Sequence, residues 1–144
     1  MKKQEWITKS ADETTALGKK IAKLFKAGTV VALSGNLGSG KTTFLKGFTS
    51  GLGLKNADAV TSPTFSLMHV YDSNPRVYHF DLYRLESEKE VLNIGFEEFV
   101  SDPEAITCVE WFEKAPGLMP PAVVKINFSV EGENERKIIL ERPE

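Results

Sequence analysis

The sequence has a single cysteine, Cys108, among its 144 residues, which excludes a disulfide bond within the chain. Such low cysteine usage is typical of proteins in a reducing compartment. No apolar run approaches the roughly 20 residues that a membrane-spanning helix needs, and residues 1–6 lack the apolar core of a signal peptide. We therefore expect a cytoplasmic protein with no membrane partner.

The sequence also lacks an excess of positive charge and a set of zinc ligands. Its 18 basic and 20 acidic residues give a net charge of −2, which offers no electrostatic argument for binding nucleic acid. His69 and His79 alternate with apolar neighbours, and no Cys/His set has zinc spacing. The length suits one domain, so we predict a single domain over residues 1–144.

One glycine-rich stretch stands out in this composition. Residues 35–42 read Gly-Asn-Leu-Gly-Ser-Gly-Lys-Thr and match G-x-x-x-x-G-K-[ST], the phosphate-binding P-loop. Its glycines allow the backbone to curl so that N–H groups point at anionic oxygens. Lys41 would bring positive charge to the β and γ phosphates, and the Thr42 hydroxyl would ligate the Mg²⁺ that bridges them.

The residues on either side of this stretch favour a nucleotide site over a chance match in a turn. Residues 29–33 form an apolar run typical of a buried parallel strand, and residues 43–48 place three apolar side chains on one helical face. The helix N-terminus would then point at phosphate. The guanine-reading N-K-x-D pattern is absent, which favours ATP. The predicted nucleotide contacts in this stretch are Gly35, Asn36, Leu37, Gly38, Ser39, Gly40, Lys41, Thr42 and Thr43.

The rest of the chain alternates between strand and helix patterns. Ser10 and Glu13 form a capping box for a helix with the apolar stripe Leu17, Ile21, Leu24 and Phe25, ending at Gly28. Ser87 caps a second helical region, which Gly95 divides in two. Apolar runs between turn signals predict strands at residues 6–8, 65–71, 77–81, 105–110, 123–130 and 136–140. The predicted fold is an α/β P-loop NTPase-like three-layer sandwich, with a mixed, mostly parallel sheet and antiparallel hairpins.

Two of these strands end in a carboxylate, at Asp81 and Glu110. Ligands of open α/β sheets bind outside the carboxyl ends of the strands, so both acids would face the nucleotide. A P-loop needs acidic groups to complete the Mg²⁺ shell and to orient a nucleophile. We predict Lys41, Asp81 and Glu110 as catalytic, and Thr42, Asp81 and Glu110 as metal-binding. Which acid contacts the metal directly stays open, and a strand-end acid in solvent or in a salt bridge is the alternative for each.

Residues 61–65, Thr-Ser-Pro-Thr-Phe, form an extended segment because of Pro63. Three hydroxyl side chains lie close together in it. One interpretation is a polar connection into the next strand, and the other is a switch-like loop that senses the γ-phosphate. The spacing does not decide between them.

Four motifs together resemble the TsaE (YjeE) family of small bacterial P-loop ATPases. They are the P-loop, the Ser-Pro-Thr segment at residues 62–64, His-Phe-Asp-Leu-Tyr-Arg at residues 79–84, and Val-Glu-Trp at residues 109–111. The P-loop is generic, whereas the other three in this order are specific, and the resemblance covers essentially the whole chain. It implies a role in making threonylcarbamoyladenosine, the modified base next to the tRNA anticodon.

The resemblance also implies site residues and partners. It implies a switch-like role for residues 61–64, with Thr64 among the nucleotide contacts, and further contacts from Ser10, Thr14 and Arg136. Family members act with the proteins TsaB and TsaD, where TsaD transfers threonylcarbamoyl to the tRNA base. The implied role is slow ATP hydrolysis that resets this complex, so tRNA would be met only through the complex.

Two other functions remain compatible with the P-loop. A small-molecule kinase would need a segment that closes over the phosphate acceptor, and we find no arginine-rich segment of that kind. A non-catalytic docking module would bind ATP to order residues 61–64 against a partner, with incidental hydrolysis.

Overall fold

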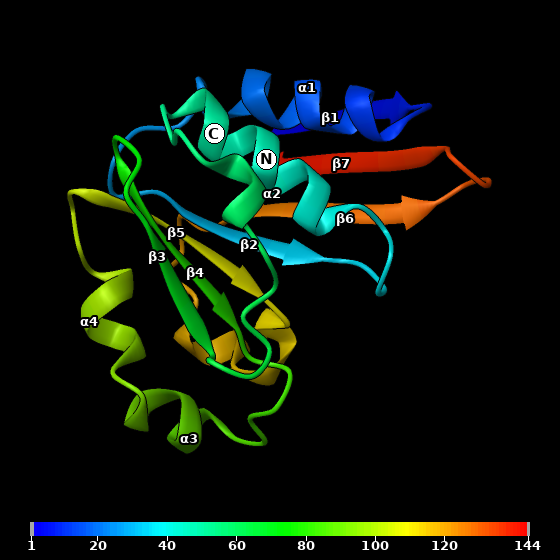
Figure 1. Ribbon diagram of the computed structural model, residues 1–144. Helices are drawn as coiled ribbons and strands as arrows, with labels where there is room; N and C mark the ends of the chain where they lie inside the picture. Colours follow the sequence, from blue (N-terminus) through cyan, green and yellow to red (C-terminus); the bar gives the residue numbers. More distant parts are fainter. Residues whose placement is uncertain (1, 144) are drawn as a thin grey trace.

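Strands from both ends of the chain form one seven-stranded sheet in the computed structural model, which describes residues 2–143 (Figure 1). The sheet order is β1-β7-β6-β2-β5-β4-β3. The strands are β1 Lys2–Thr8, β2 Val30–Ser34, β3 Met68–Tyr71, β4 Arg76–Asp81, β5 Ala105–Glu110, β6 Val124–Val130 and β7 Arg136–Arg142.

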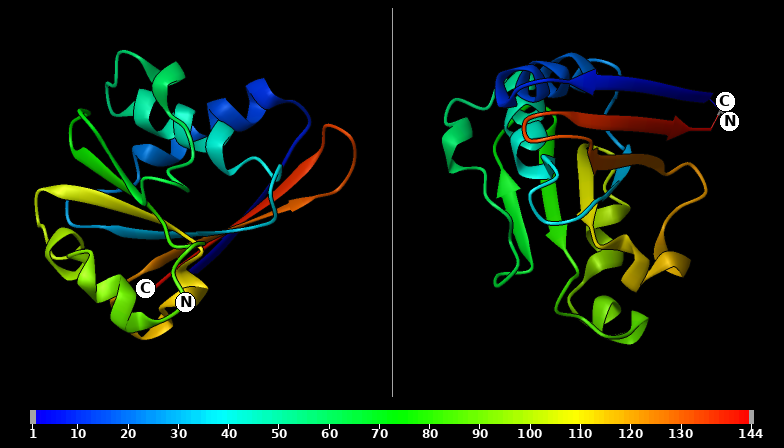
Figure 2. Two further views of the ribbon diagram at one scale, coloured as in Figure 1. Left: turned by 60° about the horizontal axis from the view of Figure 1, so that its bottom comes forward. Right: turned by 90° about the vertical axis from the view of Figure 1, so that its right-hand side faces the viewer.

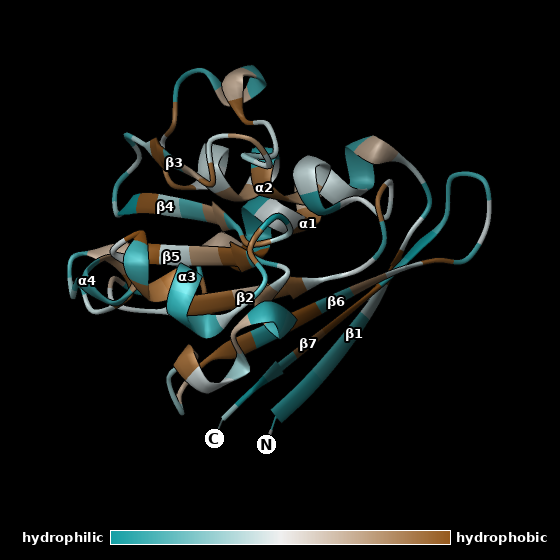
Figure 3. Cartoon of the chain, turned by 90° about the horizontal axis from the view of Figure 1, so that it is seen from below, coloured by the Kyte–Doolittle hydropathy of each residue, from teal (hydrophilic) through white to brown (hydrophobic). Residues whose placement is uncertain are grey.

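The middle of the sheet is parallel and its two sides are antiparallel. Strand β2 pairs in parallel with β5 and β6, and β5 pairs in parallel with β4. The hairpins β3–β4 and β6–β7 and the pairing of β1 with β7 are antiparallel. The central strands β2 and β5 are apolar along most of their length, whereas the edge strand β1 is largely polar (Figure 3). The predicted mixed sheet, with parallel pairing at its centre, is confirmed.

Helices cover both faces of the sheet, which confirms the predicted three layers (Figures 1 and 2). Helices α1 (Ala11–Ala22) and α2 (Lys41–Gly51) lie on one face, and α3 (Glu88–Asn93) and α4 (Phe96–Val100) on the other. Each face has its own apolar core, because side chains of a strand alternate between the two sides. Phe44 and Phe48 of α2 belong to one core, and Val91 of α3 and Phe96 of α4 to the other. Short 3₁₀ turns are η1 Ala57–Ala59, η2 Phe112–Lys114 and η3 Pro116–Leu118.

The first helix begins where the capping box predicts but ends earlier than predicted. The Ser10 side chain accepts a hydrogen bond from the Glu13 N–H (3.1 Å), while the Glu13 carboxylate accepts from the Lys9 N–H (2.7 Å). The helix stops at Ala22, six residues before Gly28. Leu24 therefore lies outside the helix with 45% of its surface exposed, so its predicted place in the apolar stripe is wrong.

The strand predicted at residues 65–71 is also shorter than predicted. Residues 64–66 form a turn, in which the Leu67 N–H donates to the Pro63 carbonyl (2.6 Å), and Leu67 itself has a φ of 70°. Strand β3 therefore begins at Met68, and Phe65 is 85% exposed instead of paired in the sheet. The turn keeps residues 61–66 free of the sheet, at the end of β4.

Candidate nucleotide site

The P-loop connects β2 to α2 and leaves the start of α2 open to an anion. Helix α2 begins at Lys41, and its N-cap residue Gly40 has a left-handed backbone (φ 105°) with no side-chain cap. The first N–H groups of a helix have no carbonyl partner within that helix. In α2 these groups, on Lys41, Thr42 and Thr43, are available to a phosphate together with the positive end of the helix dipole.

The loop backbone at Gly35 fits only glycine. Its φ is 144°, and a Cβ atom there would lie 2.6 Å from the Phe128 carbonyl oxygen and 2.7 Å from Ser39 Oγ. The Ser39 hydroxyl is buried and has no hydrogen-bond partner within the part of the chain that the structure describes. A close-fitting loop with an unsatisfied buried hydroxyl is consistent with a cradle for a polar ligand.

The Lys41 side chain reaches across the loop toward the strand ends. Its Nζ donates to the Gly35 carbonyl (2.7 Å) and lies 3.5 Å from Glu110 Oε1. The same atom sits 5.3 Å from the centre of the Trp111 ring. The ammonium group is therefore held inside the site by groups that a phosphate can replace.

The two predicted acids lie side by side on neighbouring parallel strands. Asp81 ends β4 and is the direct pairing partner of Glu110, which ends β5. Both are almost fully buried, with 2% and 3% of their surface exposed. The sheet thus brings two carboxylates to one edge, beside the P-loop strand β2, and the Lys41 ammonium offsets part of their charge.

Asp81 is hydrogen-bonded to two side chains of the segment at residues 61–64. Its Oδ2 accepts hydrogen bonds from the Ser62 and Thr64 hydroxyls, each at 2.9 Å, and its Oδ1 accepts from the Tyr83 N–H at 2.9 Å. Ser62 and Thr64 therefore form part of one wall of the site.

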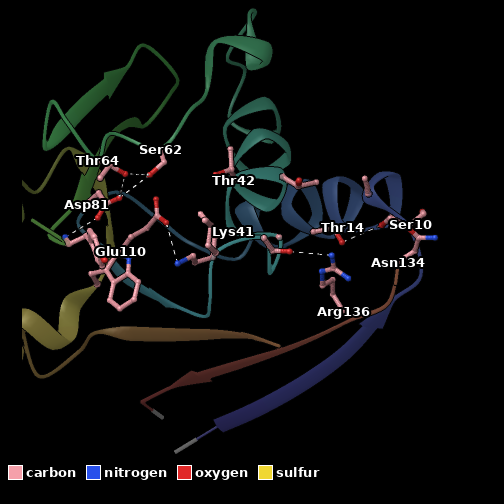
Figure 4. Close-up of a pocket in the computed structure, with 17 residues that line it drawn as sticks. Ser10, Thr14, Lys41, Thr42, Ser62, Thr64, Asp81, Glu110, Asn134 and Arg136 are labelled. Carbon is pink, nitrogen blue, oxygen red and sulfur yellow. Dashed lines mark hydrogen bonds and ion pairs between the residues drawn. The ribbon is translucent and has the colours of Figure 1, made fainter. Parts of the chain in front are cut away.

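These groups line one pocket of about 630 Å³ (Figure 4). Asp81, Glu110 and the hydroxyls of residues 62 and 64 gather at one end, and Lys41 lies between this end and the other (Figure 4). The predicted residues that line it are Ser10, Thr14, Leu37, Gly38, Gly40, Lys41, Thr42, Thr43, Thr64, Asp81, Glu110 and Arg136.

Arg136 reaches the P-loop from the far end of the chain. Its guanidinium donates to the Gly38 carbonyl (3.2 Å) and to carbonyls of the β6–β7 hairpin loop. Thr14 of α1 lies beside it, with the Thr14 methyl and the Arg136 side chain both next to Gly40. This end of the pocket therefore combines hydroxyl groups with a guanidinium, opposite the carboxylate end (Figure 4).

Three predicted contacts do not line the pocket, and several residues that do were missed. These three are Gly35, Asn36 and Ser39, of which Asn36 is exposed and Ser39 is buried. Tyr83 and Trp111 follow the two strand-end acids by one or two positions and share a ring contact at 4.9 Å. Their position after Asp81 and Glu110 was a usable signal. Ser62 belongs to the Ser-Pro-Thr segment that the sequence already singled out, whereas nothing local in the sequence marks the other two missed residues, Ala11 and Asn134.

The donor set fits Mg²⁺ better than zinc. Among residues 2–143, no group of three or more His, Cys, Asp or Glu side chains has a metal-binding arrangement. Burial raises the pKa of the Cys108 thiol well above its usual range, so this residue remains a neutral apolar group. Magnesium takes one or two carboxylates and fills its shell with water and phosphate oxygens. Thr42, Asp81 and Glu110 offer that combination.

Comparison with known proteins places the chain in a family. The model of the family described as threonylcarbamoyl adenosine biosynthesis protein TsaE matches residues 8–138. The chain belongs to the TsaE family. The resemblance inferred from the motifs is thereby confirmed.

Individual TsaE proteins align over nearly the whole chain. The tRNA threonylcarbamoyladenosine biosynthesis protein TsaE of Treponema pallidum is 36% identical over 134 residues, 93% of this chain and 97% of that protein. The protein of the same name from Bacillus subtilis is 38% identical over 139 residues, covering 96% and 85%. The crystal structure of B. subtilis YdiB superposes with a TM-score of 0.80 at 32% identity, covering 98% and 86%. Within the described residues, no helix of this TsaE-family chain combines the length and apolar character needed to cross a membrane.

Proposed function

We propose that this chain binds ATP with Mg²⁺ and hydrolyses it slowly in the biosynthesis of tRNA threonylcarbamoyladenosine. The observation that carries the proposal is the convergence of the P-loop, the Lys41 ammonium and two buried carboxylates on one pocket. The family membership supports the pathway, because relatives aligned over 93% and 96% of the chain carry that biosynthetic name.

The pocket suggests an orientation for the nucleotide. The triphosphate would lie along the P-loop and the start of α2, with its γ-phosphate toward Asp81 and Glu110. The base and ribose would then lie near Ser10, Thr14 and Arg136. Thr42 and one or both acids would hold Mg²⁺, which would supply positive charge at the γ-phosphate when bound. Lys41 adds to that charge, and Asp81 orients the attacking water.

The partners that the proposal names are TsaB and TsaD. The net charge of −2 supports a division in which another subunit contacts tRNA, because binding tRNA alone favours a basic surface. The single buried cysteine is consistent with the proposed cytoplasmic setting.

Phosphate release from Mg-ATP by the purified chain tests this function. We expect slow release by the chain alone and faster release when a TsaB–TsaD pair is added. No release under either condition would overturn the proposed ATPase.

Replacing Asp81 with asparagine is expected to lower phosphate release by about 100-fold, because the side chain that orients water loses its charge. Nucleotide affinity, measured by titration of a fluorescent ATP analogue, should change by less than about threefold. The matched control is Asp72→Asn, which neutralises an exposed acid between β3 and β4. Equal phosphate release by Asp81→Asn and wild type would remove Asp81 from the reaction.

A nucleotide-gated docking module is the second candidate, and the hydrogen bonds from Ser62 and Thr64 to Asp81 favour it. They place a surface segment where bound nucleotide would change its contacts. A Glu110→Gln chain, which keeps the contacts of Ser62 and Thr64 with Asp81, distinguishes the two functions in cells that depend on it. Growth with a variant that binds but does not hydrolyse ATP indicates docking, and failure to grow indicates that hydrolysis is required.

A further inference from the structure

A buried row of polar side chains runs behind the pocket, across three neighbouring strands. His79 of β4 places its Nε2 atom 2.6 Å from Oε2 of Glu110 on β5. Its Nδ1 atom lies 3.2 Å from the hydroxyl of Tyr71 on β3. His79 is fully buried and lines no part of the pocket. The proposed reaction does not use this histidine, so its burial beside an acid needs an explanation.

The hydrogen-bond roles in this row follow from the acid at its end. A carboxylate only accepts hydrogen bonds, so Nε2 of His79 donates to Glu110. The Tyr71 hydroxyl hydrogen-bonds with Nδ1 on the other side of the ring. Burial raises the pKa of Tyr71 to about 12, so the hydroxyl keeps its hydrogen at physiological pH.

The Tyr71 hydroxyl also contacts the segment at residues 61–64. It donates to the Thr61 carbonyl at 3.2 Å and lies 3.2 Å from His79 Nδ1 and 3.3 Å from His69 Nδ1. The segment that contacts Asp81 directly is therefore also linked to Glu110, through Tyr71 and His79.

The contact with His79 leaves the two oxygens of Glu110 in different environments. Oε2 is hydrogen-bonded to the buried imidazole, while Oε1 lies 3.5 Å from the Lys41 ammonium group in the pocket. A glutamate side chain with free rotation would lose conformational entropy on binding a metal. Because the hydrogen bond from His79 already restricts the Glu110 side chain, less conformational entropy is lost when a metal binds.

We propose that His79 is a positioning residue, which fixes Glu110 so that Oε1 faces the metal and phosphate end of the pocket. Tyr71 holds the imidazole ring in the matching orientation. This inference rests on the proposed function, since it assigns His79 a role in Mg²⁺ binding by Glu110. Hydrogen-bonding partners of metal ligands typically change metal affinity by 10–100-fold when they are removed.

Two polar substitutions separate positioning from simple filling of the core. In His79→Gln, the amide nitrogen reaches about as far as imidazole Nε2 and keeps a donor for Glu110. In His79→Asn, the shorter side chain reaches only the Nδ1 position, toward Tyr71. Both replace the buried ring with an amide, but Asn also leaves more empty space, so the affinity in EDTA, which a packing defect would lower as well, separates positioning from packing.

The measurement is the affinity for a fluorescent non-hydrolysable ATP analogue, first in EDTA and then during a Mg²⁺ titration. For His79→Asn we expect the Mg²⁺ midpoint to rise by about tenfold, with affinity in EDTA changed by less than about twofold. His79→Gln should stay within about threefold of the wild-type midpoint. The control is Tyr78→Phe, because Tyr78 is the neighbour of His79 on β4, its side chain lies on the opposite face of the sheet, and its hydroxyl donates to Asp102 (2.7 Å).

A Mg²⁺ midpoint for His79→Asn equal to that of wild type would overturn the proposal. So would equal shifts in the Asn and Gln variants, which would indicate a role in packing alone. The wild-type titration distinguishes these outcomes from failure of the proposed function. If wild type binds the analogue without any Mg²⁺ dependence, the metal site itself is wrong, whatever His79 does.

Discussion

Replacing Lys41 with alanine is expected to reduce phosphate release from ATP by at least about 100-fold, the largest effect on activity that the site predicts. The ammonium group lies at the junction of the P-loop and the two acids, within 3.5 Å of Glu110. Its removal takes away the positive charge nearest to the developing charge on the γ-phosphoryl group. It also removes the ammonium group that offsets part of the charge of the buried Glu110 carboxylate.

A coupled assay of phosphate release measures this effect. The control is Lys46→Ala, which removes a lysine from the same helix at a position that does not line the pocket. We expect Lys46→Ala to retain wild-type turnover. Turnover of Lys41→Ala within a fewfold of wild type would contradict the assignment of Lys41.

Replacing Gly47 with alanine is expected to lower the free energy of unfolding by about 3 kcal/mol, because α1 and α2 are too close for a side chain there. A Cβ atom at Gly47 would lie 1.9 Å from the Thr15 carbonyl oxygen, and one at Gly18 would lie 2.2 Å from the Phe44 carbonyl oxygen. The contacted atoms belong to the backbone, so the two helices would have to move apart. This movement would also carry Ser10 and Thr14 away from the P-loop.

Thermal unfolding followed by circular dichroism measures this effect, and the midpoint should fall by roughly 10 °C. The control is Gly132→Ala in the β6–β7 hairpin, where a Cβ atom would meet nothing closer than 3.6 Å. It should melt within about 2 °C of wild type. A Gly47→Ala protein as stable as this control would show that the helices separate without cost.

Predictions that depended on neighbouring residues were mostly correct. Ser10 and Ser87 cap helices as the capping boxes indicate, and both side chains accept the N–H three residues on. Gly95 separates α3 from α4 with a φ of 82°, and the last two strands form the expected hairpin. These features depend on bonds within a few residues, so the local pattern contains the information they need.

The errors lie where a local pattern competes with tertiary contacts. Leu24 continues the helical spacing of α1, yet the chain leaves the helix at Ala22, and Phe25 then packs against Phe48 of α2. Phe65 has a residue type suited to strands, yet the turn at residues 63–67 takes it out of the sheet. In both places the prediction extended a real helix or strand to include a neighbouring apolar residue that lies outside it.

Local spacing alone was sufficient to predict the P-loop, the two acids at strand ends and the strands and helices around them. Folding decided which of these groups meet. The order β2-β5-β4 sets Asp81 beside Glu110, and the β6–β7 hairpin brings Arg136 within 3.2 Å of the Gly38 carbonyl, 98 residues away. The same strand order places His79 of β4 within 2.6 Å of the Glu110 carboxylate on β5. Spacing along a chain specifies repeating backbone hydrogen bonds, whereas contacts between distant residues depend on which apolar faces are buried together.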